Sequence, residues 1–210
     1  MKNQWLRPQG WLGRLLLKSM NKRHSLMSDW GLSHVPIPRD GAILDVGCGG
    51  GTTIAKLALA SGSGTVHGLD HSADSVRVAS ATNAELIQSG RVAIWQGSVS
   101  QLPFASGTFD LVTTVETHFF WPNLHEDVRD VWRVIKPGGS FAIIADRYRG
   151  AKTVMSRVAE RYAHRFGMAL LTPDEHRDLL AGVGFEDIRV FTDASRGWIC
   201  AIGRKSLPAS

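Results

Sequence analysis

A run of glycines directly after a short apolar segment constrains this chain most. Residues 42–46 read Ala-Ile-Leu-Asp-Val, and Gly47, Gly49, Gly50 and Gly51 follow within five positions. Short apolar runs of this kind are typical of buried parallel strands. A glycine-rich turn after such a strand lets the backbone approach a ligand closely, and a helix after the turn directs its amide groups at the same place. The pattern therefore predicts a strand, a ligand-binding turn and a helix.

Apolar runs and helical periodicities alternate along the rest of the chain, which predicts an α/β, doubly wound, mostly parallel sheet. Only six residues, 192–197, separate the last two expected strands. Because six residues cannot hold a crossover helix, we expect this pair to be antiparallel. The seven expected strands are residues 42–46, 65–70, 92–95, 109–115, 140–145, 185–191 and 198–202. The expected helices are residues 11–27, 53–60, 73–89, 124–135, 151–167 and 173–181.

The composition excludes several classes of protein. The chain has 210 residues, of which 43% are hydrophobic and 20% charged, as in a globular domain with a small appendage. Two cysteines, Cys48 and Cys200, cannot supply a disulfide scaffold. No apolar run approaches the roughly 18 residues that a membrane span needs. We expect a cytoplasmic protein without a membrane span, either a monomer or a homodimer.

The net charge of +5 is concentrated near the N-terminus, where no acidic residue precedes Asp29. Apolar residues spaced four apart predict an amphipathic helix over residues 11–27. We expect residues 1–34 to form a helical lid segment over a pocket, and residues 35–210 to form the main domain. Permanent packing of this segment against the sheet is the alternative. A solvated helix face explains the basic residues better than a nucleic-acid site does.

The glycine pattern also distinguishes between nucleotide ligands. A dinucleotide fingerprint has glycine at its sixth position, where this chain has Thr52. A phosphate-binding P-loop needs a lysine directly after the last glycine, but the first lysine after Gly51 is Lys56, five positions later. Asp70 ends the second expected strand, where a carboxylate can bond both hydroxyls of a ribose. An ordinary turn aspartate is the alternative at this position.

Five segments resemble, in order and spacing, the motifs of class I S-adenosylmethionine-dependent methyltransferases. Residues 43–51 are similar to the glycine motif, and residues 68–72 to the acidic motif after it. Residues 96–104 resemble the adenine loop, residues 109–112 the fourth strand, and residues 134–139 the motif before the fifth strand. The resemblance implies a Rossmann-like, seven-stranded sheet with a C-terminal antiparallel pair. The most similar subgroup is the small-molecule type that resembles ubiquinone and menaquinone-biosynthesis methyltransferases.

The resemblance implies S-adenosylmethionine as the cofactor and S-adenosylhomocysteine as its product. It implies that Asp70 bonds the ribose hydroxyls and that Asp45 orients the glycine turn or the amino group. Ser98 stands where the family commonly has an aspartate, so the contact to adenine lacks a charge. The cofactor-binding residues implied are Asp45, Gly47, Cys48, Gly49, Asp70, His71, Ser98, Val99, Thr114 and Val115.

Residues 116–121 follow the fourth expected strand, and we expect them to face the methyl acceptor. His118 is the first candidate for a general base because its ordinary pKa lies near 6.5, and Glu116 is the second. A purely structural role for either residue is the alternative. No histidine, cysteine or carboxylate has a clear metal-ligand spacing, so we expect no metal. The residues expected to contact the acceptor are Phe119, Phe120, Trp121, Arg147 and Tyr148.

These features predict in-line transfer of a methyl group from S-adenosylmethionine to a small, partly apolar molecule. An RNA or protein methyltransferase that uses the basic N-terminal segment is a second hypothesis. A non-catalytic S-adenosylmethionine-binding protein is a third. Because the sequence has no RNA-binding appendage and no aromatic-basic strand motif, we expect a small-molecule acceptor and no nucleic acid.

Overall fold

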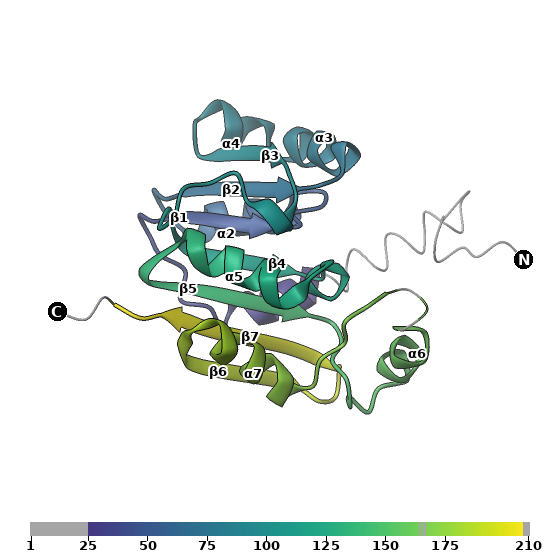
Figure 1. Cartoon of the computed structure of the whole chain (residues 1–210). Coiled ribbons are helices and arrows are strands. Elements are labelled where there is room, and N and C mark those ends of the chain that lie inside the picture. The colour runs from purple at the N-terminus through teal and green to yellow at the C-terminus, as the bar shows by residue number, and fades with distance from the viewer. Residues whose placement is uncertain (1–24, 164, 166, 208–210) are drawn as a thin grey trace, which may run out of the picture.

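The computed structural model describes residues 25–163, 165 and 167–207. A seven-stranded sheet with the strand order β3-β2-β1-β4-β5-β7-β6 forms its centre (Figure 1). The strands β1 to β5 are parallel where they pair, and β7 is antiparallel to both β5 and β6. This confirms the predicted sheet and its C-terminal antiparallel pair. The strands are β1 Ala42–Val46, β2 Thr65–Asp70, β3 Val92–Gln96, β4 Phe109–Val115, β5 Ile135–Ala145, β6 Phe185–Asp193 and β7 Trp198–Lys205.

Helices cover both faces of the sheet, because successive strand residues point to opposite faces. Ile43 packs in one apolar cluster with residues of α2 and α3, whereas Leu44 packs in another with residues of α5 and α7. In the part of the chain that the structure describes, no helix is both long enough and apolar enough to cross a membrane. The helices are α2 Thr52–Ala60, α3 Ala73–Thr82, α4 Ala84–Gln88, α5 Leu124–Val134, α6 Val154–Ala163 and α7 Pro173–Val183, with short 3₁₀ turns η1 Val99–Gln101 and η2 His118–Phe120.

Two elements differ from the sequence-based expectation. The single helix expected over residues 73–89 is interrupted at Asn83, whose side-chain Nδ2 donates to the Gly51 carbonyl at 3.0 Å and to the Ala79 carbonyl at 2.9 Å. This amide ties the break between α3 and α4 to the glycine turn. Strand β5 begins at Ile135 instead of residue 140, because Ile135 pairs with Phe109 across a register shift.

The described part of the N-terminal segment packs against the sheet. Residues 25–32 are helical, and Met27 is fully buried. A Cβ atom built on Gly31 would lie 2.3 Å from Ile144 Cγ2, so the bare backbone of this helix touches β5. Most of the helix predicted for residues 11–27 falls on residues 1–24, which lie outside the described residues. The lid role of residues 1–34 therefore stays a prediction.

Candidate functional site

Two cavities meet at the glycine turn, at the carboxyl end of β1. Ligands of open α/β sheets bind at this edge. The first, here named the Cys48 cavity, has a volume of about 550 Å³. The second, named the Ser98 cavity, has about 320 Å³. Gly47 and Thr117 line both cavities, so the two are neighbours across the turn.

The backbone of the turn is tightly held, and one side of it is open. The amides of Gly47 and Cys48 both donate to the Leu69 carbonyl, at 2.7 and 3.1 Å. Gly47 and Gly49 have φ angles of 77° and 52°, in the left-handed region that favours glycine. A Cβ atom on Gly49 would meet no atom within 4 Å, and Gly49 lines the Cys48 cavity. The turn therefore leaves room for a ligand directly against its backbone.

The Asp70 carboxylate joins the end of β2 to the glycine turn. One oxygen accepts from the Gly49 amide and the other from the Ser72 amide, each at 2.9 Å. Asp70 is buried and lines the Ser98 cavity. An ionised carboxylate has about four acceptor positions, and two of them are used here. The remaining positions can accept the two hydroxyls of a ribose, as the sequence predicted.

Asp45 lies at the floor of the Cys48 cavity. Its pKa is raised to about 7, chiefly by burial; a hydrogen bond from the Thr113 hydroxyl at 2.8 Å opposes the rise, and the charge of Asp70 contributes to it. A cation in the cavity would favour the ionised carboxylate. The arrangement therefore suits a positively charged group.

The other expected cofactor residues occupy different positions around the cavities. The Ser98 hydroxyl lies at its cavity but already accepts from the Ser100 amide at 3.2 Å, while Val99 forms a buried wall. The ring of His71 is exposed and lies 3.6 Å from the Asp70 carboxylate. The Thr114 hydroxyl is buried and bonds that of Thr117 at 2.6 Å. Cys48 and Val115 line the Cys48 cavity, and burial raises the pKa of the Cys48 thiol, so the thiol stays protonated.

Glu116 directly follows β4 and lines the Cys48 cavity. Its φ angle is 65°, which is unusual for a non-glycine residue and indicates local strain. Its carboxylate accepts a short hydrogen bond from the Asp146 amide and lies 3.7 Å from the Arg147 guanidinium. Burial and then the nearby Asp146 carboxylate raise the pKa of Glu116 well above its ordinary value, although Arg147 opposes this. Glu116 is therefore a buried carboxyl group that holds a proton more readily than an exposed one does.

His118 does not occupy the position that the sequence predicted. It is fully buried, it lines neither cavity, and its Nε2 lies 3.2 Å from His176 Nε2. His176 Nδ1 lies 2.8 Å from the Thr172 carbonyl, which can only accept. His176 therefore carries its proton on Nδ1, and His118 donates from Nε2. Burial, and then His176, lower the pKa of His118 well below its ordinary value, so it is neutral.

The expected acceptor residues separate into two groups. Phe120 and Trp121 line the Ser98 cavity, on the side of Asp70. Phe119 and Tyr148 are instead buried in an apolar cluster with the inner side of α6. Arg147 pairs with Asp146 and Glu116, and its guanidinium carbon lies 5.5 Å from the centre of the Phe119 ring. The structure therefore does not bring Phe119 or Tyr148 to either cavity.

Sequence reasoning missed two features of the site. Thr117 separates the two cavities, and its hydroxyl donates to the Val46 carbonyl at 3.1 Å. Ser25 and Ser28 line the Cys48 cavity, and Lys56 Nζ donates to their hydroxyls at 3.0 and 2.7 Å. Lys56 also pairs with Asp29 at 2.7 Å. No local sequence pattern links Lys56 to a segment about 30 positions earlier.

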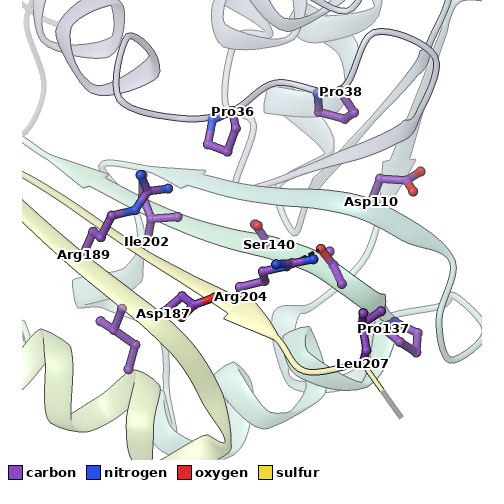
Figure 2. A pocket seen from close by; sticks show the side chains of 13 residues that line it. Pro36, Pro38, Asp110, Pro137, Ser140, Asp187, Arg189, Ile202, Arg204 and Leu207 are labelled. Carbon is purple, nitrogen blue, oxygen red and sulfur yellow. Dashed lines mark hydrogen bonds between the residues drawn. The ribbon is translucent and has the colours of Figure 1, made fainter. Parts of the chain in front are cut away.

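A separate groove of about 1030 Å³ lies elsewhere on the described chain (Figure 2). It is lined by Asp110, Ser140 and Arg204, near the amino ends of β4 and β5. Asp110 is tied to Lys136 Nζ and to the Ala42 amide, each at 2.8 Å. The groove therefore lies at the end of the sheet opposite to the glycine turn and does not belong to the same site.

Residues 43–139 match the model of a methyltransferase domain family. An uncharacterized methyltransferase, YdaC of Bacillus subtilis, is 25% identical over 174 residues, which cover 81% of this chain and 86% of YdaC. A demethylmenaquinone methyltransferase of Bacillus licheniformis is 31% identical over 119 residues, covering 56% of this chain and 50% of that enzyme. This chain thus matches nearly all of YdaC but only half of the second relative.

Solved methyltransferase structures share the fold. A methyltransferase in complex with the Trm112 activator of Haloferax volcanii has a TM-score of 0.76 at 22% identity. The match covers 90% of this chain and 93% of that structure's chain. A SAM-dependent methyltransferase of Aquifex aeolicus has a TM-score of 0.70 at 17% identity, over 84% of this chain and 88% of its own. A geranyl diphosphate methyltransferase with sinefungin bound has a TM-score of 0.68 at 16% identity; the match covers 86% of this chain and 78% of that methyltransferase.

The buried histidine pair generates a prediction about stability in acid. Because the folded state lowers the pKa of His118, stability is complete above about pH 6.5 and is lost as the pH falls below it. Between pH 7 and pH 5.5 these histidines become protonated in the unfolded chain but stay neutral in the folded chain. We therefore expect the free energy of unfolding to fall by about 1 kcal/mol for each histidine that stays neutral. Urea unfolding at the two pH values measures it.

The double variant His118→Gln/His176→Gln should lose less stability than the wild type between the two pH values. Comparing the two proteins cancels the contribution of the other titrating groups. His125→Gln, at a half-exposed position on α5, is the matched control and should keep the steep loss. Equal pH sensitivity in the wild type and the double variant would contradict the neutral pair.

Proposed function

We propose that this chain, which is an S-adenosylmethionine-dependent methyltransferase, transfers the methyl group to a small, partly apolar molecule. The observation that carries this proposal is the pair of cavities sharing Gly47 and Thr117. One cavity ends at Asp70 and the other at Asp45 and Glu116. Together they suit a long ligand that lies across the glycine turn with a cationic end. The demethylmenaquinone and geranyl diphosphate methyltransferases are named for molecules with an apolar chain and a polar part, which supports a partly apolar acceptor.

In this proposal the Ser98 cavity takes the adenosine part of the cofactor. The free acceptor positions of Asp70 bond the ribose hydroxyls, and Val99 and Trp121 form apolar walls for the base. The Cys48 cavity takes the methionine part, because Gly49 leaves its backbone open there. Asp45, with a pKa of about 7, faces the ammonium group. The cofactor supplies an activated methyl group with a very good leaving group.

The acceptor enters at the Glu116 end of the Cys48 cavity. An acceptor that carries a proton, such as a phenol, needs a base when it attacks the methyl carbon. Glu116 can accept this proton when it is ionised, and its raised pKa makes it a stronger base than an ordinary carboxylate. Asp146 and Arg147 hold the Glu116 carboxylate in place through its hydrogen bond and ion pair. Glu116 therefore replaces His118 as the first candidate for the base.

An acceptor screen tests the proposed function. The purified chain with S-adenosylmethionine is offered thiols, phenols, amines and quinone precursors, and release of S-adenosylhomocysteine is measured. We expect turnover on apolar members of the small-molecule panel. Transfer RNA and a mixed peptide library serve as the competing acceptors. Turnover on RNA or peptides alone would contradict a small-molecule acceptor, and cofactor binding without turnover on any acceptor would favour a non-catalytic binding protein.

Asp70→Ala should weaken S-adenosylmethionine binding at least tenfold. The variant loses two charge-assisted hydrogen bonds to the ribose, which are worth about 1.5–3 kcal/mol each. Isothermal titration calorimetry measures the affinity, and a thermal melt checks that the protein is folded. Asp74→Ala, at an exposed position on α3, is the control and should bind normally. Unchanged affinity in a folded Asp70→Ala protein would exclude Asp70 as the ribose ligand.

Glu116→Gln should lower turnover of a proton-bearing acceptor by 10²–10⁴-fold, the usual contribution of a general base. S-adenosylmethionine affinity should change by less than about threefold, since the isosteric amide keeps the cavity shape. In the wild type, turnover should rise with pH through the raised pKa of Glu116 and then level off.

His118→Gln is the comparison variant. It should lower turnover less than about fivefold at neutral pH, because His118 lines neither cavity. The opposite result, a large loss in His118→Gln and a small one in Glu116→Gln, would return His118 to the role of base.

A further inference from the structure

The outward face of α6 carries exposed apolar side chains. Val154, Val158 and Tyr162 are 75%, 46% and 44% exposed. They follow one another at intervals of four residues, so they lie along one side of the helix. The inner side of the helix carries Ala159, which packs in the apolar cluster with Phe119 and Tyr148. The helix is therefore apolar on both its inner and its outer side.

Arginines lie between these apolar side chains. Arg157 and Arg161 are exposed and share the outward side of α6 by helical spacing. Among the described residues, neither has an ion pair or a side-chain hydrogen bond. Elsewhere on the surface, arginines pair with the acidic residue three positions earlier, as in the pairs Asp74–Arg77, Glu126–Arg129 and Asp174–Arg177.

The acidic residue of α6 does not neutralise the arginines. Glu160 lies on another side of the helix by the same spacing, and its Oε1 accepts from the Gly150 amide at 2.6 Å. This hydrogen bond uses Glu160 to anchor α6 to the loop after β5. The outward side of α6 is therefore both cationic and apolar. We name Val154, Val158, Tyr162, Arg157 and Arg161 the α6 surface.

Helix α6 lies at the same end of the sheet as the two cavities, beyond the ends of the parallel strands (Figure 1). The connection from β5 to α6 begins with Asp146 and Arg147, the two residues that contact Glu116. The connection after α6 passes η2, where the Ala169 amide donates to the Phe119 carbonyl at 2.8 Å. The segment that carries the α6 surface is thus anchored on both sides at residues next to the Cys48 cavity.

We propose that the α6 surface binds an anionic lipid membrane, from which an apolar acceptor reaches the Cys48 cavity. The choice of acceptor rests on the proposed function, but the lipid contact does not. A helix with interleaved basic and apolar side chains lies in the membrane interface, with arginines at the lipid phosphates and apolar groups below them. Two arginines and three modest apolar side chains give weak, reversible and salt-sensitive binding.

The geometry favours a lipid surface over a macromolecular partner. Ten helical residues form a ridge about 15 Å long. The surface of one such ridge is much smaller than the roughly 800 Å² that each partner buries in a stable protein interface. Nucleic acid would use the arginines but would leave the three exposed apolar side chains in water. A lipid interface satisfies both kinds of side chain at once.

Vesicle sedimentation of the full chain tests the proposal. Vesicles of phosphatidylcholine with 30% phosphatidylglycerol are compared with pure phosphatidylcholine, at low and at high salt. We expect binding to the anionic vesicles at low salt, and at least tenfold weaker binding to the neutral ones or at high salt. Arg157→Glu/Arg161→Glu, and separately Val154→Asp/Val158→Asp, should each lower binding to anionic vesicles at least tenfold.

Arg129→Glu/Arg177→Glu is the matched control, because it makes the same change in net charge at exposed positions of α5 and α7. It should bind vesicles within about twofold of the wild type. If the wild type and both α6 variants bound anionic vesicles equally, the proposal would be overturned. Any attraction to the vesicles would then come from another part of the chain. Loss of RNA binding without loss of vesicle binding in the α6 variants would overturn it in favour of a nucleic-acid partner.

A kinetic comparison separates this proposal from the proposed function. With a water-soluble acceptor, the α6 variants should have the same kcat and KM as the wild type. With an apolar acceptor carried in anionic vesicles, their apparent KM should rise at least fivefold. If no acceptor is methylated, the proposed function fails while the vesicle-binding result still stands by itself. An unchanged KM in vesicles would refute delivery of the acceptor through α6.

Discussion

The Asp70 carboxylate is the contact on which the geometry of the site depends. It ends β2 and accepts hydrogen bonds from the amides of Gly49 and Ser72, so it fixes the turn after β1 and the start of α3 together. The amide of Gly47 reinforces this link through the Leu69 carbonyl. Because β1 and β2 are neighbours in the parallel sheet, the two strand ends already lie side by side. One buried carboxylate therefore holds the glycine turn and the start of α3 together, and it lines the Ser98 cavity.

Three buried carboxyl groups line the two cavities and determine their electrostatics. Asp45, Asp70 and Glu116 line the two cavities, and burial raises the pKa of Asp45 to about 7 and that of Glu116 well above normal. A pyrophosphate placed against Asp45 would add like charge in a low dielectric and would be repelled. A sulfonium or ammonium group instead stabilises the ionised carboxylates. The electrostatics of the turn therefore agree with the proposed S-adenosylmethionine ligand and disfavour a dinucleotide.

The sequence predicted the fold well, because the alternation of strands and helices is a local pattern. The glycine turn and Asp70 are also recognisable from a few neighbouring residues each, and the structure joins them across 21 positions by a hydrogen bond. The surroundings of residues 118–121 could not be predicted in the same way. An aromatic run such as residues 118–121 does not reveal which side chains face inward once η2 forms, and burial of His118 depends on His176, which is 58 positions away. Likewise, Asn83 breaks a regular helical pattern to reach Gly51, a contact that periodicity cannot report.

This difference has a physical basis in the connections of the chain. Much of the lining of the two cavities comes from short turns at strand ends, which backbone hydrogen bonds between neighbouring strands hold in place. The surroundings of Phe119 and Tyr148 depend instead on the long connection between β5 and α7, which is held by non-local contacts such as that between Ala169 and Phe119. A turn that follows a strand can be recognised from a few residues, whereas a contact across 50 positions leaves no local pattern. Motifs of the first kind therefore indicate a cofactor more readily than they indicate a methyl acceptor.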